Sequence, residues 1–313
     1  MKKYVINEEF LSRLDILETL LKNNVAGMFG GNKQSKYGSF GSSCEFADYR
    51  DYLPGDDITK IDWNSYARFD KLYLKLFLDE RQMHTRIYID ASRSMDYGRG
   101  EKAEQAVRLA AALAYMSVNE MDRVSVYVIK DRAVTELIPP TVGKESFFNR
   151  VGRFNEIEFD GDSYISEAIL PSTVGMGDGM SVIISDFLTD NDYETAIDHL
   201  VSKKRDVFCI QILSREELMP QLTGKMHLFD SENLDKTYKK NIDRDILKAY
   251  RAALSYATGR IRDYCFSRGA NYLLASAEDD IGEITPAFRE LPVGARQQRH
   301  HVDIPSELRT ERK

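Results

Sequence analysis

Hydrophobic and polar positions follow two alternating patterns from about Thr85 onward. Short apolar runs rich in β-branched residues are separated by longer segments with apolar positions at helical spacing. The expected strands are 86–90, 123–130, 180–187, 206–214 and 271–276, and the expected helices include 101–118, 192–204 and 243–268. Strands that alternate with helices of ten or more residues predict a mostly parallel sheet with helices on both faces. We therefore expect a doubly wound α/β fold.

Some segments of this region depart from the simple alternation. The run 133–138 follows the strand 123–130 so closely that a hairpin is expected. Residues 144–154 and 163–170 are helix candidates, and the run 225–233 is expected to form an edge strand. Gly269 is expected to end the long helix that starts near residue 243.

The first 84 residues have a different pattern. Phe10, Leu14, Leu17 and Leu21 form one helical stripe, which we expect to dock on the protein's own body rather than on a membrane, because the polar positions are largely acidic. A loop is expected at 30–43, a turn at 53–57, and a strand where leucines alternate from 72 to 78. We divide the chain into an N-terminal helix and accessory β region (1–84), an α/β domain (85–292) and a disordered tail (293–313).

Composition and charge exclude some functions. The net charge of −7 argues against nucleic-acid binding, which usually requires a basic protein. The three cysteines are odd in number and far apart, which suits a reducing compartment. No window has the length of apolar sequence needed for a membrane span, and the N-terminus lacks the apolar core of a signal peptide. We expect a cytoplasmic protein.

Candidate chemistry lies where two buried strands end. The first strand ends on Asp90-x-Ser92-x-Ser94, and the run 180–187 ends with Asp186 before Phe187. In open α/β sheets, sites form at the carboxyl ends of strands, so these oxygens are expected to meet. Hydroxyls and carboxylates suit Mg²⁺, with Mn²⁺ or Ca²⁺ as alternatives. Two carboxylates alone do not over-neutralise a divalent ion, so it would keep waters that an outside carboxylate can displace.

This arrangement resembles the metal-ion-dependent adhesion site of von Willebrand factor A domains. The resemblance implies a third hydroxyl on a later loop, and Ser163 stands at the matching position, although Gly161-Asp162 replaces the two glycines of many members. It implies direct contact of Ser92, Ser94 and Ser163 with the ion. Asp90 and Asp186 would hold its waters, and a partner's Glu or Asp would take the last position.

A longer resemblance covers almost the whole chain. The segment 46–81 resembles the signature that precedes the A domain in the bacterial domain-of-unknown-function 58 family. The matching positions are Arg50, Tyr52, Gly55, Asp56, Ile61, Asp62, Trp63, Ala67 and Arg68, followed by Lys102, 122–124 and 184–187. The resemblance implies a von Willebrand factor A-like fold and a divalent-ion protein-interaction module, often paired with MoxR-type AAA+ ATPases.

Other interpretations stay open at this point. The Asp-Ser-Ser cluster can simply cap the next helix. A metal-dependent, phosphatase-like hydrolase is the alternative function, and a scaffold with a degenerate site is a third. We expect no enzyme, because no nucleophile–base set is visible and Gly-x-Ser-x-Gly is absent.

The aromatic and basic residues of the accessory signature also leave alternatives. Trp63, Tyr52 and Tyr66 can be packing anchors, which we favour, or a partner-binding face. Arg50 and Arg68 are expected to pair with nearby aspartates rather than bind an anion.

Overall fold

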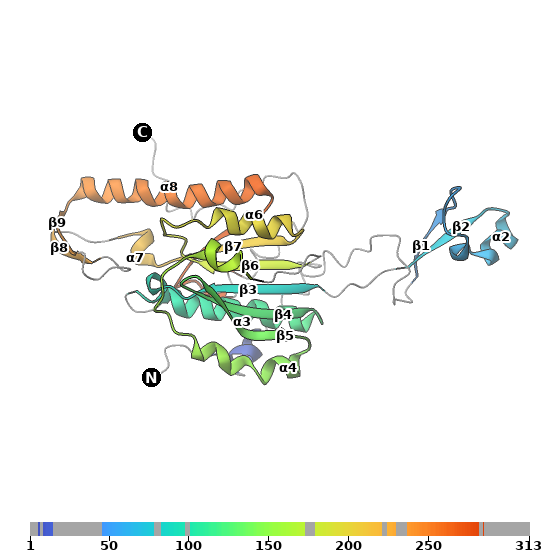
Figure 1. Cartoon of the computed structure of the whole chain (residues 1–313), viewed down its shortest axis with the longest axis horizontal. Coiled ribbons are helices and arrows are strands. Elements are labelled where there is room, and N and C mark those ends of the chain that lie inside the picture. The colour runs from blue at the N-terminus through green and yellow to red at the C-terminus, as the bar shows by residue number, and fades with distance from the viewer. Residues whose placement is uncertain are drawn as a thin grey trace.

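The computed structural model describes residues 6, 9–14, 46–77, 83–97, 101–172, 179–220, 224–229, 237–281 and 284. Its centre is a six-stranded sheet (Figure 1). The strands are β3 (His84–Asp90), β4 (Arg123–Lys130), β5 (Ala133–Thr141), β6 (Met180–Ser185), β7 (Asp206–Leu213) and β10 (Asn271–Ser276). Their spatial order is β10-β7-β6-β3-β4-β5, and all neighbours are parallel except β4 and β5, which form the expected hairpin.

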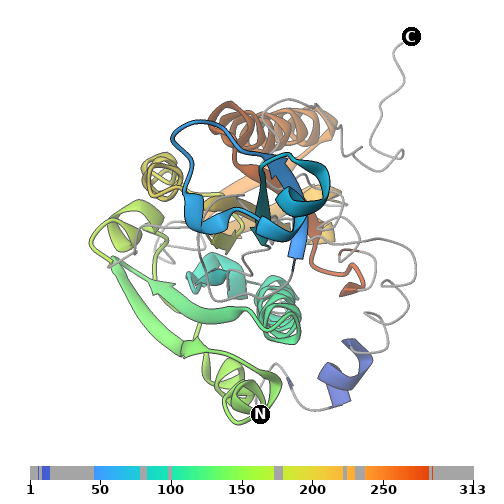
Figure 2. The ribbon, with the colours of Figure 1, turned by 90° about the vertical axis from the view of Figure 1, so that its right-hand side faces the viewer.

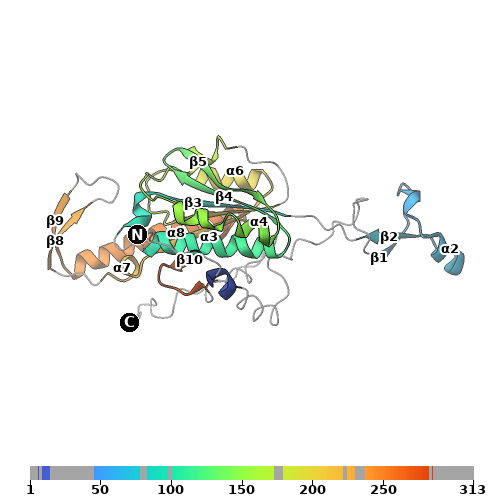
Figure 3. The same cartoon turned by 90° about the horizontal axis from the view of Figure 1, so that it is seen from below.

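Helices cover both faces of this sheet. They are α3 (Glu101–Asn119), α4 (Lys144–Phe148), α5 (Ile165–Ile169), α6 (Glu194–Ser202), α7 (Arg215–Leu218) and α8 (Arg244–Arg268), with 3-10 turns η2 (Arg93–Asp96) and η3 (Val151–Glu156). One core joins α3 and α4 to the sheet, and a second core joins α5, α6 and α8 to the opposite face (Figure 3). In the sheet, β4 lies on one side of β3, and β6, which comes later in the chain, lies on the other side of β3. The doubly wound α/β prediction is therefore confirmed.

The first described helical turn packs on this body. Residues 9–14 are helical, and Leu11 and Leu14 are buried in the same core as α3. The backbone N–H of Ile6 donates to the Asn155 side chain at 2.9 Å, and the Asn155 amide donates back to Ile6 O at 3.1 Å. The expected docking on the protein's own body is confirmed for this part. Leu17, Leu21, the loop 30–43 and the tail 293–313 lie outside the described residues.

The accessory region forms a small unit of its own. Strands β1 (Phe46–Asp51) and β2 (Tyr73–Phe77) pair antiparallel, with η1 (Ile58–Lys60) and α2 (Trp63–Phe69) between them. Figure 2 views this unit from its own side, in front of the sheet. The turn at 53–57 is present, and the predicted pairing of Arg50 with Asp56 is confirmed at 2.8 Å.

The aromatic residues of the accessory unit do not pack as we favoured. Trp63 is 61% exposed and Tyr66 is 41% exposed, with their rings in edge contact at 6.2 Å. α2 buries no residue, because its seven residues lie on a two-stranded ribbon that has little core to offer. The packing-anchor interpretation is therefore wrong for Trp63 and Tyr66.

The prediction that residues 225–233 form an edge strand of the main sheet is wrong. Strand β8 (Gly224–Phe229) pairs antiparallel with β9 (Thr237–Ile242) in a separate two-stranded sheet and does not join the main one. α8 follows and ends, as predicted, at Gly269 with a left-handed backbone (φ +74°). None of the helices in the described ranges combines the length and apolar composition needed to cross a membrane.

Candidate metal centre

The predicted cluster is built around Asp90, the last residue of β3. Ile89 lies beside Ile184 in the parallel register, so Asp90 reaches the level of Ser185 at the end of β6. The Ser185 hydroxyl donates to Asp90 Oδ2 at 2.6 Å. β3 therefore delivers a fully buried carboxylate to the carboxyl edge of the sheet, as its pattern predicts.

Three serines beyond the strand gather around this carboxylate. The Ser163 hydroxyl donates to Asp90 Oδ2 at 2.8 Å, and the Ser92 backbone N–H donates to Asp90 Oδ1 at 3.0 Å. The hydroxyl oxygens of Ser92 and Ser94 lie 3.1 Å apart. The structure thus brings Asp90, Ser92, Ser94 and Ser163 together, although Ser163 is distant in the sequence.

A close backbone approach positions Ser163. Gly161 lies beside Ser92, and its carbonyl accepts the Arg93 N–H at 2.7 Å. A Cβ at Gly161 would come within 2.8 Å of Lys130 Cγ and 3.1 Å of Asp131 N. A side chain at this position would push the loop outward, so glycine here keeps Ser163 against Asp90.

Asp186 ends the neighbouring strand but has different partners. Its Oδ2 accepts the Lys102 ammonium at 2.9 Å, and its Oδ1 accepts the Leu188 N–H at 3.1 Å. Side chains alternate along a strand, so Ser185 points to Asp90 while Asp186 turns toward α3, which carries Lys102. The Gln211 amide also donates to the Asp186 carbonyl at 2.6 Å and fixes its backbone.

The electrostatics of the two carboxylates reflect these partners. Burial raises the pKa of Asp90, and the nearby charge of Asp186 raises it further against the opposing effect of three donors. Burial alone would lower the pKa of Lys102, but the carboxylates of Asp186 and Glu217 outweigh it and hold that pKa above its usual value. Lys102 is therefore a cation held by two carboxylates, whereas Asp90 accepts hydrogen bonds from Ser92, Ser163 and Ser185.

These residues fit a divalent ion through their donor chemistry. Within the described residues, no group of three or more His, Cys, Asp or Glu side chains is placed to hold a metal ion. The donors gathered here are serine hydroxyls and carboxyl oxygens, which are the kind that Mg²⁺ accepts. Hydroxyls from two separate segments converge on one buried carboxyl group. All five predicted residues are buried, and Ser94 is the most exposed at 8%. A partner side chain would have to approach past Ser94.

Three residues of the site were not predicted from the sequence. Ser185 entered only within the family pattern 184–187, because it lies inside an apolar run that gives it no signal of its own. Lys102 was noted only as part of a family pattern, and its contact with Asp186 joins residues 84 positions apart. Glu217 was not among the sequence candidates, and the structure shows it in a capping box with Ser214 at the start of α7.

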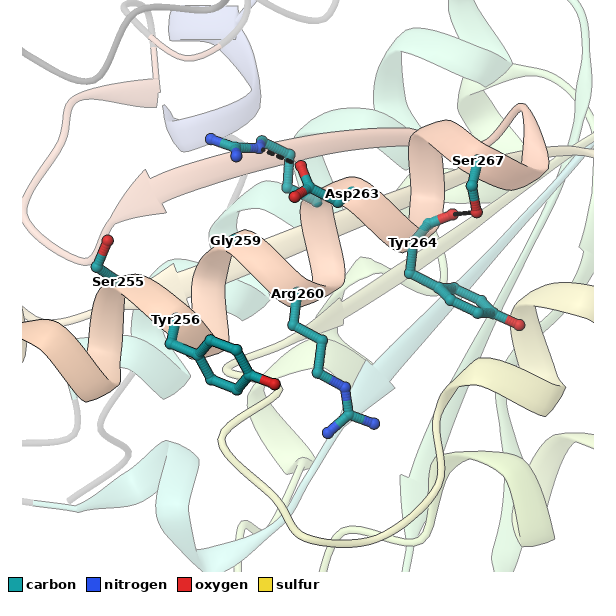
Figure 4. Close-up of a pocket in the computed structure, with 8 residues that line it drawn as sticks. Ser255, Tyr256, Gly259, Arg260, Asp263, Tyr264 and Ser267 are labelled. Atoms are coloured by element: carbon teal, nitrogen blue, oxygen red, sulfur yellow. Dashed lines mark hydrogen bonds and ion pairs between the residues drawn. The ribbon is translucent and has the colours of Figure 1, made fainter.

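A separate hollow of about 580 Å³ lies on the outer surface of α8 (Figure 4). It is lined by Tyr256, Arg260 and Tyr264, among others. Arg260 there pairs with Glu194 at 2.8 Å. None of the predicted site residues lines this hollow, so it is distinct from the candidate metal centre.

The fold and the site together define a class of protein. A doubly wound α/β sheet with one antiparallel edge strand, and Asp-x-Ser-x-Ser at the end of its first strand, is the architecture that the sequence predicts. The family model described as "Protein of unknown function DUF58" matches residues 48–258. The chain belongs to this family.

Individual proteins are also similar to parts of this chain. The chain is 25% identical over 227 residues to the uncharacterized protein Rv1480 of Mycobacterium tuberculosis, covering 70% of each chain. It is similar to an aerotolerance-related membrane protein of Bacteroides fragilis at 15% identity, covering 66% of this chain and 96% of that one, with a TM-score of 0.38. The SpRpn10 VWA domain is 11% identical, with 65% and 93% covered and a TM-score of 0.36. Likeness at this level does not establish function.

Proposed function

We propose that this protein is a divalent-cation-dependent protein-interaction module. Ser92, Ser94 and Ser163 would hold Mg²⁺, with Mn²⁺ or Ca²⁺ as alternatives, while Asp90 and Asp186 orient the surrounding groups. The bound ion would supply a positive charge with an open coordination position. The observation that carries this proposal is the convergence of Ser163 and Ser185 on the buried Asp90 carboxylate.

The partner would contribute an acidic side chain. Neutral hydroxyl ligands leave the ion with positive charge, which a Glu or Asp from another protein can neutralise. The family resemblance makes a MoxR-type AAA+ ATPase the partner to test first. Such a pair would act in the assembly or maturation of a protein complex, and this protein would bind rather than catalyse.

The metal proposal is tested by calorimetric titration of the full chain with Mg²⁺. We expect Ser92→Ala/Ser94→Ala to lower the affinity at least about tenfold, because two of three direct ligands are lost. The matched control is Ser117→Ala, since Ser117 is a buried serine whose hydroxyl donates to Leu113 O within α3, away from the cluster. Its affinity should equal that of the wild type.

Binding of the purified ATPase is measured with the same proteins. We expect capture with Mg²⁺ that is lost with a chelator and in the double variant, but kept in the control. If Mg²⁺, Mn²⁺ and Ca²⁺ all fail to bind the wild type, the metal-dependent module is wrong. Phosphoester hydrolysis that disappears in Asp90→Asn would instead favour the hydrolase.

A further inference from the structure

A buried lysine links the candidate metal centre to a second acidic residue. Lys102 stands in the first turn of α3 with its side chain only 4% exposed. Its ammonium lies 2.9 Å from Asp186 Oδ2 and 2.7 Å from Glu217 Oε1. A lysine is rarely buried to this extent unless it is paired, and here two carboxylates share it.

Both carboxylates are fixed independently of the lysine. Glu217 Oε2 accepts the Ser214 backbone N–H at 2.8 Å, and the Glu217 carbonyl accepts the Tyr250 hydroxyl at 3.1 Å. Asp186 is held by the Leu188 N–H and through its own carbonyl by Gln211. Removal of Lys102 would therefore leave two anions in place rather than release them.

The formal charges show what Lys102 does to the site. Asp186 and Glu217 contribute two negative charges and Lys102 contributes one positive charge, so this trio carries a net charge of −1. The charge of Asp186 acts on Asp90, whose pKa it raises, so the partners of Asp186 affect the site. The lysine also occupies the Asp186 oxygen that would otherwise be free to attract the ion or its waters.

We propose that Lys102 is a positioning residue that sets the affinity of the site for a divalent cation. It holds Asp186 and Glu217 and cancels one negative charge, so the ion binds weakly enough to be exchanged when a partner binds. This inference rests on the proposed function. It differs from a purely structural role, in which the ion pairs would stabilise the fold without affecting the ion.

The test compares three variants of the full chain by calorimetric titration with Mg²⁺ and by thermal unfolding without metal. Lys102→Met removes the charge but keeps the apolar stem, and we expect its Mg²⁺ affinity to rise at least about tenfold. Glu217→Gln removes a negative charge, and we expect its affinity to fall several-fold. Lys102→Arg keeps the positive charge and should bind as the wild type does.

The proposal predicts that the Mg²⁺ affinity rises in Lys102→Met and falls in Glu217→Gln, and a structural role does not predict these opposite changes. A structural lysine predicts lower melting temperatures in Lys102→Met and Glu217→Gln with affinities that are unchanged or reduced in both, and that result would overturn the proposal. If Lys102→Met does not fold without metal, the comparison of Glu217→Gln with Lys102→Arg decides the question. Equal affinities in those two would then contradict it.

Failure of the proposed function gives a different result. If the wild type binds no divalent ion but Lys102→Met does, the lysine controls the site as inferred, and the metal-dependent module is wrong for the native chain. If the wild type binds Mg²⁺ and Lys102→Met binds it equally, the inference is wrong and the module stands. If neither protein binds, both are wrong.

Discussion

At the scale of single residues, His84 is half-buried beside positive charges, and this makes the stability of the fold depend on pH. His84 opens β3, and its ring lies 2.8 Å from the Ser125 hydroxyl. Burial, together with the positive charges of Arg86, Arg205 and Arg123, lowers the pKa of His84 from 6.5 to about 4. The unfolded chain therefore takes up a proton at higher pH than the folded protein does, so acid favours unfolding at this site.

The prediction concerns the pH dependence of the free energy of unfolding. The contribution of neutral His84 is complete above pH 6.5 and is lost as the pH falls toward 4. We expect about 1–2 kcal/mol to disappear over this window, less than the full shift implies, because solvent screens a partly exposed ring. In His84→Gln, the free energy of unfolding should lack this decrease between pH 6.5 and 4. Denaturant titration at a series of pH values measures it. An identical pH profile in the variant would refute the assignment.

The residues of the candidate site differ in how far the sequence could predict them. Asp90, Ser92 and Ser94 are alternate positions at the end of an apolar run, so the end of the strand and the turn after it bring them together. Ser163 could be selected only through a family pattern, because its contact with Asp90 spans 73 positions. The Lys102 contact depends on how α3 lies across two strands, which periodicity does not specify.

At the scale of elements, the loop that carries Ser163 tests whether backbone position matters for the site. Gly161→Ala adds a methyl group where Lys130 Cγ and Asp131 N leave no room. We expect the loop to move away from Ser92, with a several-fold lower Mg²⁺ affinity and a stability loss of about 1 kcal/mol. Calorimetric titration and denaturant unfolding measure these two effects.

A second glycine in the same region provides the control. A Cβ at Gly152, in η3, would meet nothing within 4 Å, and its backbone is not left-handed. Gly152→Ala should therefore leave Mg²⁺ affinity unchanged. Equal affinities in the two alanine variants would show that the loop tolerates displacement without affecting the ion.

Secondary-structure elements were predictable where they pack against a core. β6 is buried at every position and reads as a short apolar run, whereas α3 was recognised by apolar residues at helical spacing. β9 was missed because its sequence, TYKKNI, is polar and pairs only with β8. Periodicity detects a face that packs against a core, and a strand of an isolated pair has no such face.

At the scale of the whole molecule, stability is unevenly distributed along α8. This 25-residue helix begins at the Asp243 cap, whose side chain accepts the Ile246 N–H at 2.9 Å. Its buried residues are Ile261 and Cys265, both in the second half. The first half extends beyond the sheet beside β8 and β9 (Figures 1 and 3). The first half contacts the rest of the protein through Tyr250 but buries no residue, and a helix segment with so little packing is only marginally stable in water.

We therefore predict that hydrogen exchange divides α8 into two parts. Amides of residues 248–256 should exchange at least about a hundredfold faster than those of residues 261–268, because opening the first part exposes little buried surface. Peptide-resolved deuterium uptake measures this in the full chain. Uniform protection along α8 would contradict the division. It would mean that the first half is covered in solution, and a dilution series would show whether a second copy covers it.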